Sequence, residues 1–214
     1  MIALCLQHHK EADSGAFTVE QLRQMKMIGT QGIVSGRFHW RRENTVFVAG
    51  GNVFADCPVI LAIDDRPVLW LSKSPEGNDL FNIDLHGRTG RVAFQMRDNE
   101  WLAIPDLDDV KCPPNARSLA LRSKHLDIAL GLEFGDWSFA DFSQRLSAER
   151  AEGLFLNLGV AQESMMLVCV VTGKFQSAVT LKRTKLEQPG GGRIEGSVFT
   201  HCGGGINIGT RLAS

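Results

Sequence analysis

The chain has 214 residues, of which 43% are hydrophobic and 22% charged, and its formal net charge is −1. These values are typical of a globular protein with one sizeable domain, or of a small motif followed by one domain. The near-neutral balance excludes a chain-wide basic footprint of the kind that marks many nucleic-acid-binding domains, so any such contact must depend on local patches.

The five cysteines are odd in number and widely spaced: Cys5, Cys57, Cys112, Cys169 and Cys202. This distribution does not indicate a disulfide framework and favours a reducing compartment. Cys57, Cys169 and Cys202 have small or apolar neighbours and are interpreted as buried, inert thiols. No apolar run approaches the ~18 residues of a membrane span, and the N-terminus lacks the pattern of a signal peptide. We therefore expect a cytoplasmic protein without a membrane partner.

Residues 1–30 are predicted to form a first, small unit, a short strand followed by a helix. Apolar residues alternate over residues 2–6, as in a half-buried strand. Thr18 and Gln21 have the spacing of a capping box, which starts a helix that we expect to end near Gly29.

From Ile33 onward the hydrophobic pattern changes to the period of two that is typical of strands. Three hairpins are predicted, which pair residues 59–63 with 68–70, 81–85 with 92–96, and 119–121 with 126–132. Short strands separated by turn signals indicate a β-sandwich or a related fold. The fold class is therefore predicted to be mainly β, α+β overall: a short strand–helix segment followed by an antiparallel β-rich, sandwich-like domain over residues 33–214.

Residues 136–152 interrupt this pattern and are a candidate boundary within the larger domain. Ser138 is expected to cap a helix that carries Phe139 and Phe142 on one face. Strands are predicted again over residues 154–160 and 165–171. After a glycine-rich break near residue 190, the last segment is expected to form a closing hairpin or strand pair. One coil of a parallel β-helix is the weaker alternative, because such folds need at least three repeats.

The chemistry suggested by the sequence is concentrated near the N-terminus. Cys5 and His8 are separated by two residues, a spacing that lets both side chains converge on one tetrahedral zinc ion. One such knuckle supplies half of the four ligands that a closed zinc site needs. His9 follows directly, and an isolated pair of adjacent histidines is equally consistent with two exposed polar residues at the end of a strand.

Residues 4–9, Leu-Cys-Leu-Gln-His-His, continued by Ala12 and Asp13, resemble the C-terminal half of the HNH endonuclease motif. Motifs of that family often end in Leu-Cys-x-x-Cys-His or Leu-Cys-x-x-His-His. The resemblance covers residues 2–28. It implies metal-dependent cleavage of a nucleic acid, with DNA as the partner.

The resemblance also implies roles for single residues. Cys5 and His8 stand where half of a structural zinc knuckle stands. His9 stands where the last histidine of the motif holds the catalytic divalent metal, which is Mg, Mn, Ni or Zn and which polarises the scissile phosphate. The general-base histidine, the central asparagine and the first knuckle of the family precede the part that this sequence matches. We therefore expect an N-terminally truncated motif that is inactive as this fragment.

A second candidate site is the basic stretch that contains Arg37, Arg41 and Arg42, with Phe38 and Trp40 between them. Arginine and aromatic side chains together can hold phosphates and stack on bases. The alternation is better explained by a strand whose aromatic side chains pack inward while the basic ones remain in solvent, and this is the interpretation that we favour.

Three interpretations remain open. The chain is the C-terminal part of an HNH-type endonuclease with an appended β-rich domain. Alternatively, it is a non-catalytic β-rich binding module, of unknown partner, with a vestigial nuclease segment. In the third, the Cys-x-x-His-His spacing is accidental in an unrelated β-protein.

Overall fold

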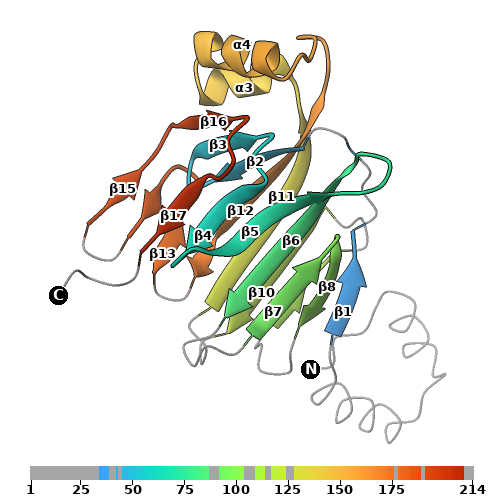
Figure 1. Cartoon of the computed structure of the whole chain (residues 1–214), viewed down its shortest axis with the longest axis vertical. Coiled ribbons are helices and arrows are strands. Elements are labelled where there is room, and N and C mark those ends of the chain that lie inside the picture. Colours follow the sequence, from blue (N-terminus) through green and yellow to red (C-terminus); the bar gives the residue numbers. More distant parts are fainter. Residues whose placement is uncertain are drawn as a thin grey trace, which may run out of the picture.

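The computed structural model describes residues 34–38, 42, 45–86, 92–103, 109–113, 117–123, 128–175, 178–188 and 191–209. The predicted strand–helix unit over residues 1–30 lies outside the described residues. The described residues form two β-sheets that pack face to face, and two helices among them cover one end of the second sheet (Figure 1). The prediction of a mainly β, sandwich-like fold is confirmed.

The first sheet has seven strands in the order β1-β8-β7-β6-β5-β4-β17. These strands are β1 (Val34–Arg37), β4 (Val59–Ile63), β5 (Arg66–Lys73), β6 (Asp79–His86), β7 (Val92–Arg97), β8 (Glu100–Ala103) and β17 (Ile206–Ile208). All neighbours from β1 to β4 are antiparallel, so the predicted hairpins β4–β5 and β6–β7 are confirmed. β17 differs, because it pairs with β4 in parallel.

The β4–β5 turn is tighter than the sequence indicated. Asp64 and Asp65 both have positive φ angles, 49° and 62°, which is the geometry of a two-residue hairpin turn. Pro67, expected in the turn or at an edge, is instead the second residue of β5 and lies opposite Ala62. It precedes Leu69, where pairing with β6 begins, so its missing N–H interrupts no ladder on that side.

The second sheet runs in the order β15-β14-β13-β12-β11-β10-β9. Three further strands extend it beside β12: β2 pairs with β12, β3 with β2, and β16 with β3. Its strands are β2 (Thr45–Ala49), β3 (Asn52–Ala55), β9 (Asp109–Lys111), β10 (Ser118–Ser123), β11 (Ile128–Trp137), β12 (Met166–Phe175), β13 (Val179–Leu181), β14 (Leu186–Glu187), β15 (Arg193–Ile194) and β16 (Val198–Thr200). β12 pairs with β11 along one side. Its other side is shared by β2, in parallel, and by β13, antiparallel.

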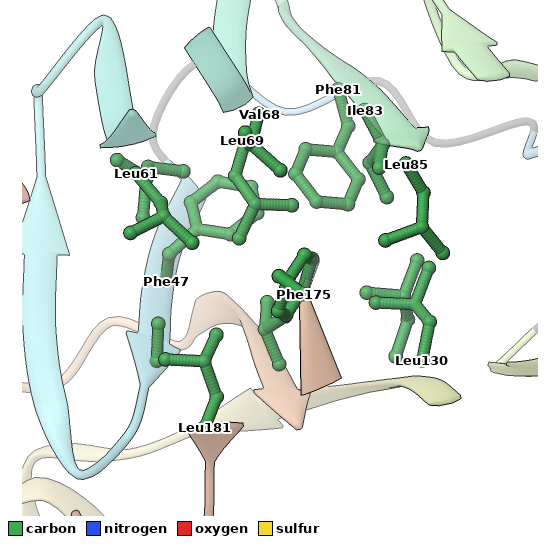
Figure 2. Close-up of a cluster of buried hydrophobic side chains, with 14 of the residues drawn as sticks. Phe47, Leu61, Val68, Leu69, Phe81, Ile83, Leu85, Leu130, Phe175 and Leu181 are labelled. Atoms are coloured by element: carbon green, nitrogen blue, oxygen red, sulfur yellow. The ribbon is translucent and has the colours of Figure 1, made fainter. Parts of the chain in front are cut away.

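The main core lies between the two sheets. Apolar residues of the facing strands point into it, and Figure 2 labels ten of them, which are Phe47, Leu61, Val68, Leu69, Phe81, Ile83, Leu85, Leu130, Phe175 and Leu181. On β2, Phe47 and Ala49 belong to this core, whereas Val46 and Val48 face the other way and pack against the helices. β2 is buried on both faces, which explains its nearly continuous apolar sequence.

The helical segment contains two helices, α3 (Phe139–Arg145) and α4 (Ala148–Asn157), rather than one. The predicted cap is confirmed: the Asp141 N–H donates to Ser138 Oγ, and the Ser138 N–H donates to the Asp141 carboxylate over 2.9 Å. Ser147 caps α4 with φ of 148° and separates the helices. The predicted strand over residues 154–160 is wrong. Most of that run belongs to α4, and the periodicity of a short apolar run does not separate helix from strand.

The predicted closing hairpin is also wrong. β16 and β17 do not pair with each other: β16 pairs in parallel with β3 in the second sheet, and β17 with β4 in the first. The chain thus passes from the second sheet to the first twice, once from β3 to β4 and once from β16 to β17, and the later passage lies beside the earlier one (Figure 1). Strands of three residues carry too little periodicity to show this pairing.

Candidate functional site

The three predicted metal ligands, Cys5, His8 and His9, lie outside the described residues, so their arrangement stays a prediction. In the part of the chain that the structure describes, no group of three or more His, Cys, Asp or Glu residues is placed to hold a metal ion. The helices of that same part lack the length and hydropathy needed to cross a membrane.

The arginines of the predicted nucleic-acid contact lie against carboxylates. Arg37, at the end of β1, lies 3.3 Å from Glu100 of β8, and both side chains are more than half exposed. Arg42 lies 3.6 Å from Asp136 at the end of β11. Arg41 lies outside the described residues. The two arginines thus neighbour strands of different sheets, and their contact with DNA stays a prediction.

A second basic surface emerges only in the folded chain, on the outer face of the second sheet. It is a shallow depression of about 510 Å³. We call it the basic trough and define it by six of its residues: a floor of Ala120, Ala129 and Gly131 with Lys111, Arg122 and Lys174 around it. The floor is low because its side chains are small. Gly131 leaves room there for the Thr172 hydroxyl, which would lie 2.7 Å from a Cβ at position 131.

The strand register explains how the cations come together. Arg122 on β10 lies opposite Ala129 on β11, which lies opposite Lys174 on β12. Two strand spacings of ~4.8 Å place the backbones of the two basic residues ~10 Å apart. Lys111 on β9 lies opposite Ala120 in the next row. Among the described residues that line the trough, the one carboxylate is Asp109, 3.0 Å from Lys111. The described lining therefore carries more positive than negative side chains, although the whole chain is near neutral.

A second polar cluster lies where the chain passes between the sheets. The His201 Nδ1 atom lies 2.5 Å from a carboxylate oxygen of Asp56, and its Nε2 atom lies 2.7 Å from the carbonyl oxygen of Asn157. Both partners are acceptors, so the ring satisfies both only when it is doubly protonated. The Asn157 carbonyl and the Asp56 carboxylate accordingly raise the pKa of His201. The cluster ties the end of α4 to the sandwich.

Asp56 also lines a cavity of about 260 Å³, together with Cys57, Lys73 and Asp79. The Asp79 side chain is only 6% exposed. Burial raises the pKa of this carboxyl, although Lys73 Nζ, at 2.7 Å, and the Thr45 N–H, at 2.7 Å, favour its charged form. The ionic groups of the cavity wall are thus paired, Asp79 with Lys73 and Asp56 with His201.

Neither the trough nor this cluster was predicted from the sequence. The residues of each come from strands and helices far apart in the chain, and no local spacing marks them. Comparisons with models of known protein families, with curated proteins and with solved structures find no match.

Proposed function

We propose that this chain carries the metal-binding half of an HNH-type nuclease site, joined to a β-sandwich domain that holds the nucleic acid. The single observation that carries the proposal is the run Leu-Cys-Leu-Gln-His-His at residues 4–9, followed by Ala12 and Asp13. Such a motif is a hypothesis about chemistry, and its spacing is more specific than an isolated pair of ligands.

The proposal assigns distinct roles to the three ligands. Cys5 and His8 hold a structural zinc ion as half of its ligand set, and His9 holds a catalytic divalent cation. Adjacent residues of an extended chain point to opposite sides, so His8 and His9 serve different ions. Residues 2–28 supply no general base by this resemblance. The proposal therefore assigns metal binding, and not hydrolysis by itself, to this chain.

The basic trough supports a role for the sandwich in holding DNA. A phosphate backbone is a flexible row of anions, and surfaces that bind it without reading bases combine lysine and arginine side chains with close backbone approach. Lys111, Arg122 and Lys174 supply the charge, and the small floor residues let a strand approach the sheet. We therefore propose the trough, rather than the stretch around Arg37 and Arg42, as the main DNA contact of the described domain.

The test is metal binding by the purified chain, followed with Co²⁺ because a cobalt–thiolate bond absorbs light in the near ultraviolet. The wild-type chain is expected to show this absorption, and Cys5→Ser to lose it. His9→Ala is expected to keep the thiolate absorption but to bind one metal fewer by titration calorimetry. Binding should be weak, because half of the zinc ligands are missing.

Matched controls are Cys112→Ser, which removes an exposed thiol, and His86→Ala, which removes a histidine at the end of β6. Neither should change the Co²⁺ titration. Absorption that survives Cys5→Ser would overturn the proposed zinc knuckle. Absence of any metal affinity, combined with DNA binding, would favour the alternative of a non-catalytic binding module with a vestigial nuclease segment.

A further inference from the structure

The two passages from the second sheet to the first, which we call the β3–β4 corner and the β16–β17 corner, are in strict register. Partners in both parallel ladders are offset by 145 residues, with Ala55 opposite Thr200 before the corner and Leu61 opposite Ile206 after it. Two hydrogen-bonded pairs share this offset, Asn52 with Ser197 and Asp56 with His201. Both corners therefore contain the same number of residues, and each residue of one lies beside its counterpart in the other.

The cysteines of the two corners are such counterparts, because Cys202 follows Cys57 by the same offset. Cys57 Sγ donates to the carbonyl of Phe199, in the facing segment, over 3.5 Å. Cys202 Sγ donates to the carbonyl of Thr200 over 3.3 Å. Cys202 is also among the groups that shift the pKa of the Cys57 thiol. Adjacent strands lie ~4.8 Å apart, which falls within the Cα separations of ~4.4–6.8 Å that a disulfide bridges.

We propose that Cys57 and Cys202 form a reversible disulfide that joins the β3–β4 corner to the β16–β17 corner. The oxidant is a low-molecular-weight disulfide such as glutathione disulfide. In a reducing compartment the pair remains a dithiol, as it is in this structure. The interpretation of these two residues as inert thiols is thereby replaced by a redox-active pair, whereas Cys169 is fully buried with its pKa raised by burial.

The order of the steps follows from burial. Cys202 is partly exposed, whereas Cys57 is 1% exposed, so Cys202 meets the oxidant first. The Cys202 thiolate attacks one sulfur of glutathione disulfide, the S–S bond breaks, and one glutathione leaves and takes up a proton. Cys57 then loses its proton, and its thiolate attacks the Cys202 sulfur and expels the second glutathione. Two protein thiols are oxidised, and one glutathione disulfide is reduced to two thiols.

The second step is expected to be the slower one. Burial, the largest cause, raises the pKa of the Cys57 thiol to about 11, so little thiolate is present near neutral pH. Proximity compensates, because the mixed disulfide on Cys202 forms directly beside the resolving thiol. The bond closes a loop of roughly 145 residues in the unfolded chain, so it should raise the midpoint of thermal unfolding.

The experiment incubates the full folded chain with glutathione disulfide and follows it by intact mass, peptide mapping and thermal unfolding. The expected product has lost two hydrogen atoms, contains a peptide that joins Cys57 to Cys202, and unfolds at a higher temperature until dithiothreitol reverses the shift. Cys57→Ser is expected to stop at a stable mixed disulfide on Cys202. Cys202→Ser should leave Cys57 unmodified, and Cys112→Ser should behave as wild type.

A wild-type chain that accumulates the mixed disulfide without closing it would overturn the proposal. So would a cross-link that forms only in denaturant, because the folded register would then play no part. Both cysteine variants are conservative, and circular dichroism of each establishes that it is folded before oxidation. None of these results depends on metal, and peptide mapping separates the Cys57–Cys202 cross-link from any modification of Cys5.

Discussion

His201 and Asp56 form an ion pair between the two corners, with 2.5 Å between Nδ1 and the carboxylate although 145 residues separate them in the chain. The opposite ring nitrogen contacts the carbonyl of Asn157, close to the C-terminus of α4. A cation at that position also interacts favourably with the helix dipole. One side chain thus connects both corners and a helix, and it does so in its protonated form.

The first prediction concerns pH. The Asn157 carbonyl and the Asp56 carboxylate raise the pKa of His201 above its ordinary value of 6.5. The protonated pair therefore stabilises the fold fully below that value, and the stabilisation is lost as pH rises through the raised pKa. Urea unfolding of the wild type from about pH 5 to 9 should show this loss, and His201→Asn should flatten it. Asparagine suits the left-handed backbone at this position, where φ is 51°.

His86→Asn is the matched control for this experiment, since it removes a histidine of the sandwich outside the ion pair. Its stability should keep the pH dependence of the wild type. An unchanged slope in His201→Asn would show that the ring contributes no linked proton.

The second prediction concerns Asp79, whose carboxyl is desolvated and accepts from the Thr45 N–H. Its raised pKa means that the folded state favours the protonated form, so its contribution to stability increases as pH falls through that pKa. Asp79→Asn keeps an acceptor for Thr45 and should change the unfolding free energy by less than about 1 kcal/mol. Asp79→Ala leaves the buried N–H unpaired and should cost about 1–3 kcal/mol.

Urea unfolding of both Asp79 variants at neutral pH measures the difference. If Asp79→Asn is as damaging as Asp79→Ala, then the charge, through its ion pair with Lys73, outweighs the hydrogen bond.

The third prediction uses two adjacent glycines at the β16–β17 corner. A Cβ at Gly205 would lie 2.4 Å from the carbonyl oxygen of Ile60 and 2.8 Å from the ring of Phe54. Gly205→Ala should therefore lower the unfolding free energy by about 1–3 kcal/mol, as overpacking of a close contact does. A Cβ at Gly204 meets nothing within 4 Å, so Gly204→Ala should be neutral or slightly stabilising. Equal effects of the two changes in chemical denaturation would refute the close packing of the corners.

The fourth prediction concerns the basic trough. The double variant Arg122→Gln, Lys174→Gln should weaken binding of duplex DNA and reduce the slope of log affinity against log salt by up to ~0.9 for each phosphate that the protein no longer neutralises. Fluorescence anisotropy over a range of salt concentrations measures both. The matched control removes Lys182 and Arg183 of the same sheet region, which lie against Glu187 and Glu133 respectively. Equally weakened binding in the two double variants would indicate attraction to charge in general and not to the trough.

The sequence predicts those features whose partners are close in the chain. Alternation identifies both strands of the β6–β7 hairpin, and the spacing of Ser138 and Asp141 marks the start of α3. The wrong strand prediction over residues 154–160 has a local cause. Leu154 and Phe155 lie in an apolar run that is too short to reveal its period. In the fold they belong to a helix that packs on β2 and β12.

Long-range features escape local patterns altogether. The partner of Ile206 is Leu61, and nothing near either residue encodes that distance. The cations of the trough come from β9, β10 and β12, so their proximity depends on strand pairing. The metal motif is the opposite case. Its residues are contiguous and readable in the sequence, yet they lie outside the residues that the structure describes.

The late position of β16 and β17 in the chain has a consequence for biosynthesis. On the ribosome, β3 and β4 emerge long before the strands that pair with them in parallel. During that interval the sides of β3 and β4 that these strands later cover carry open hydrogen-bonding groups, to which other nascent chains can add strands. Translation that stops before residue 198 would leave these edges open permanently. Such truncated products are therefore expected to aggregate. Supplying the C-terminal segment in trans is expected to reduce this aggregation.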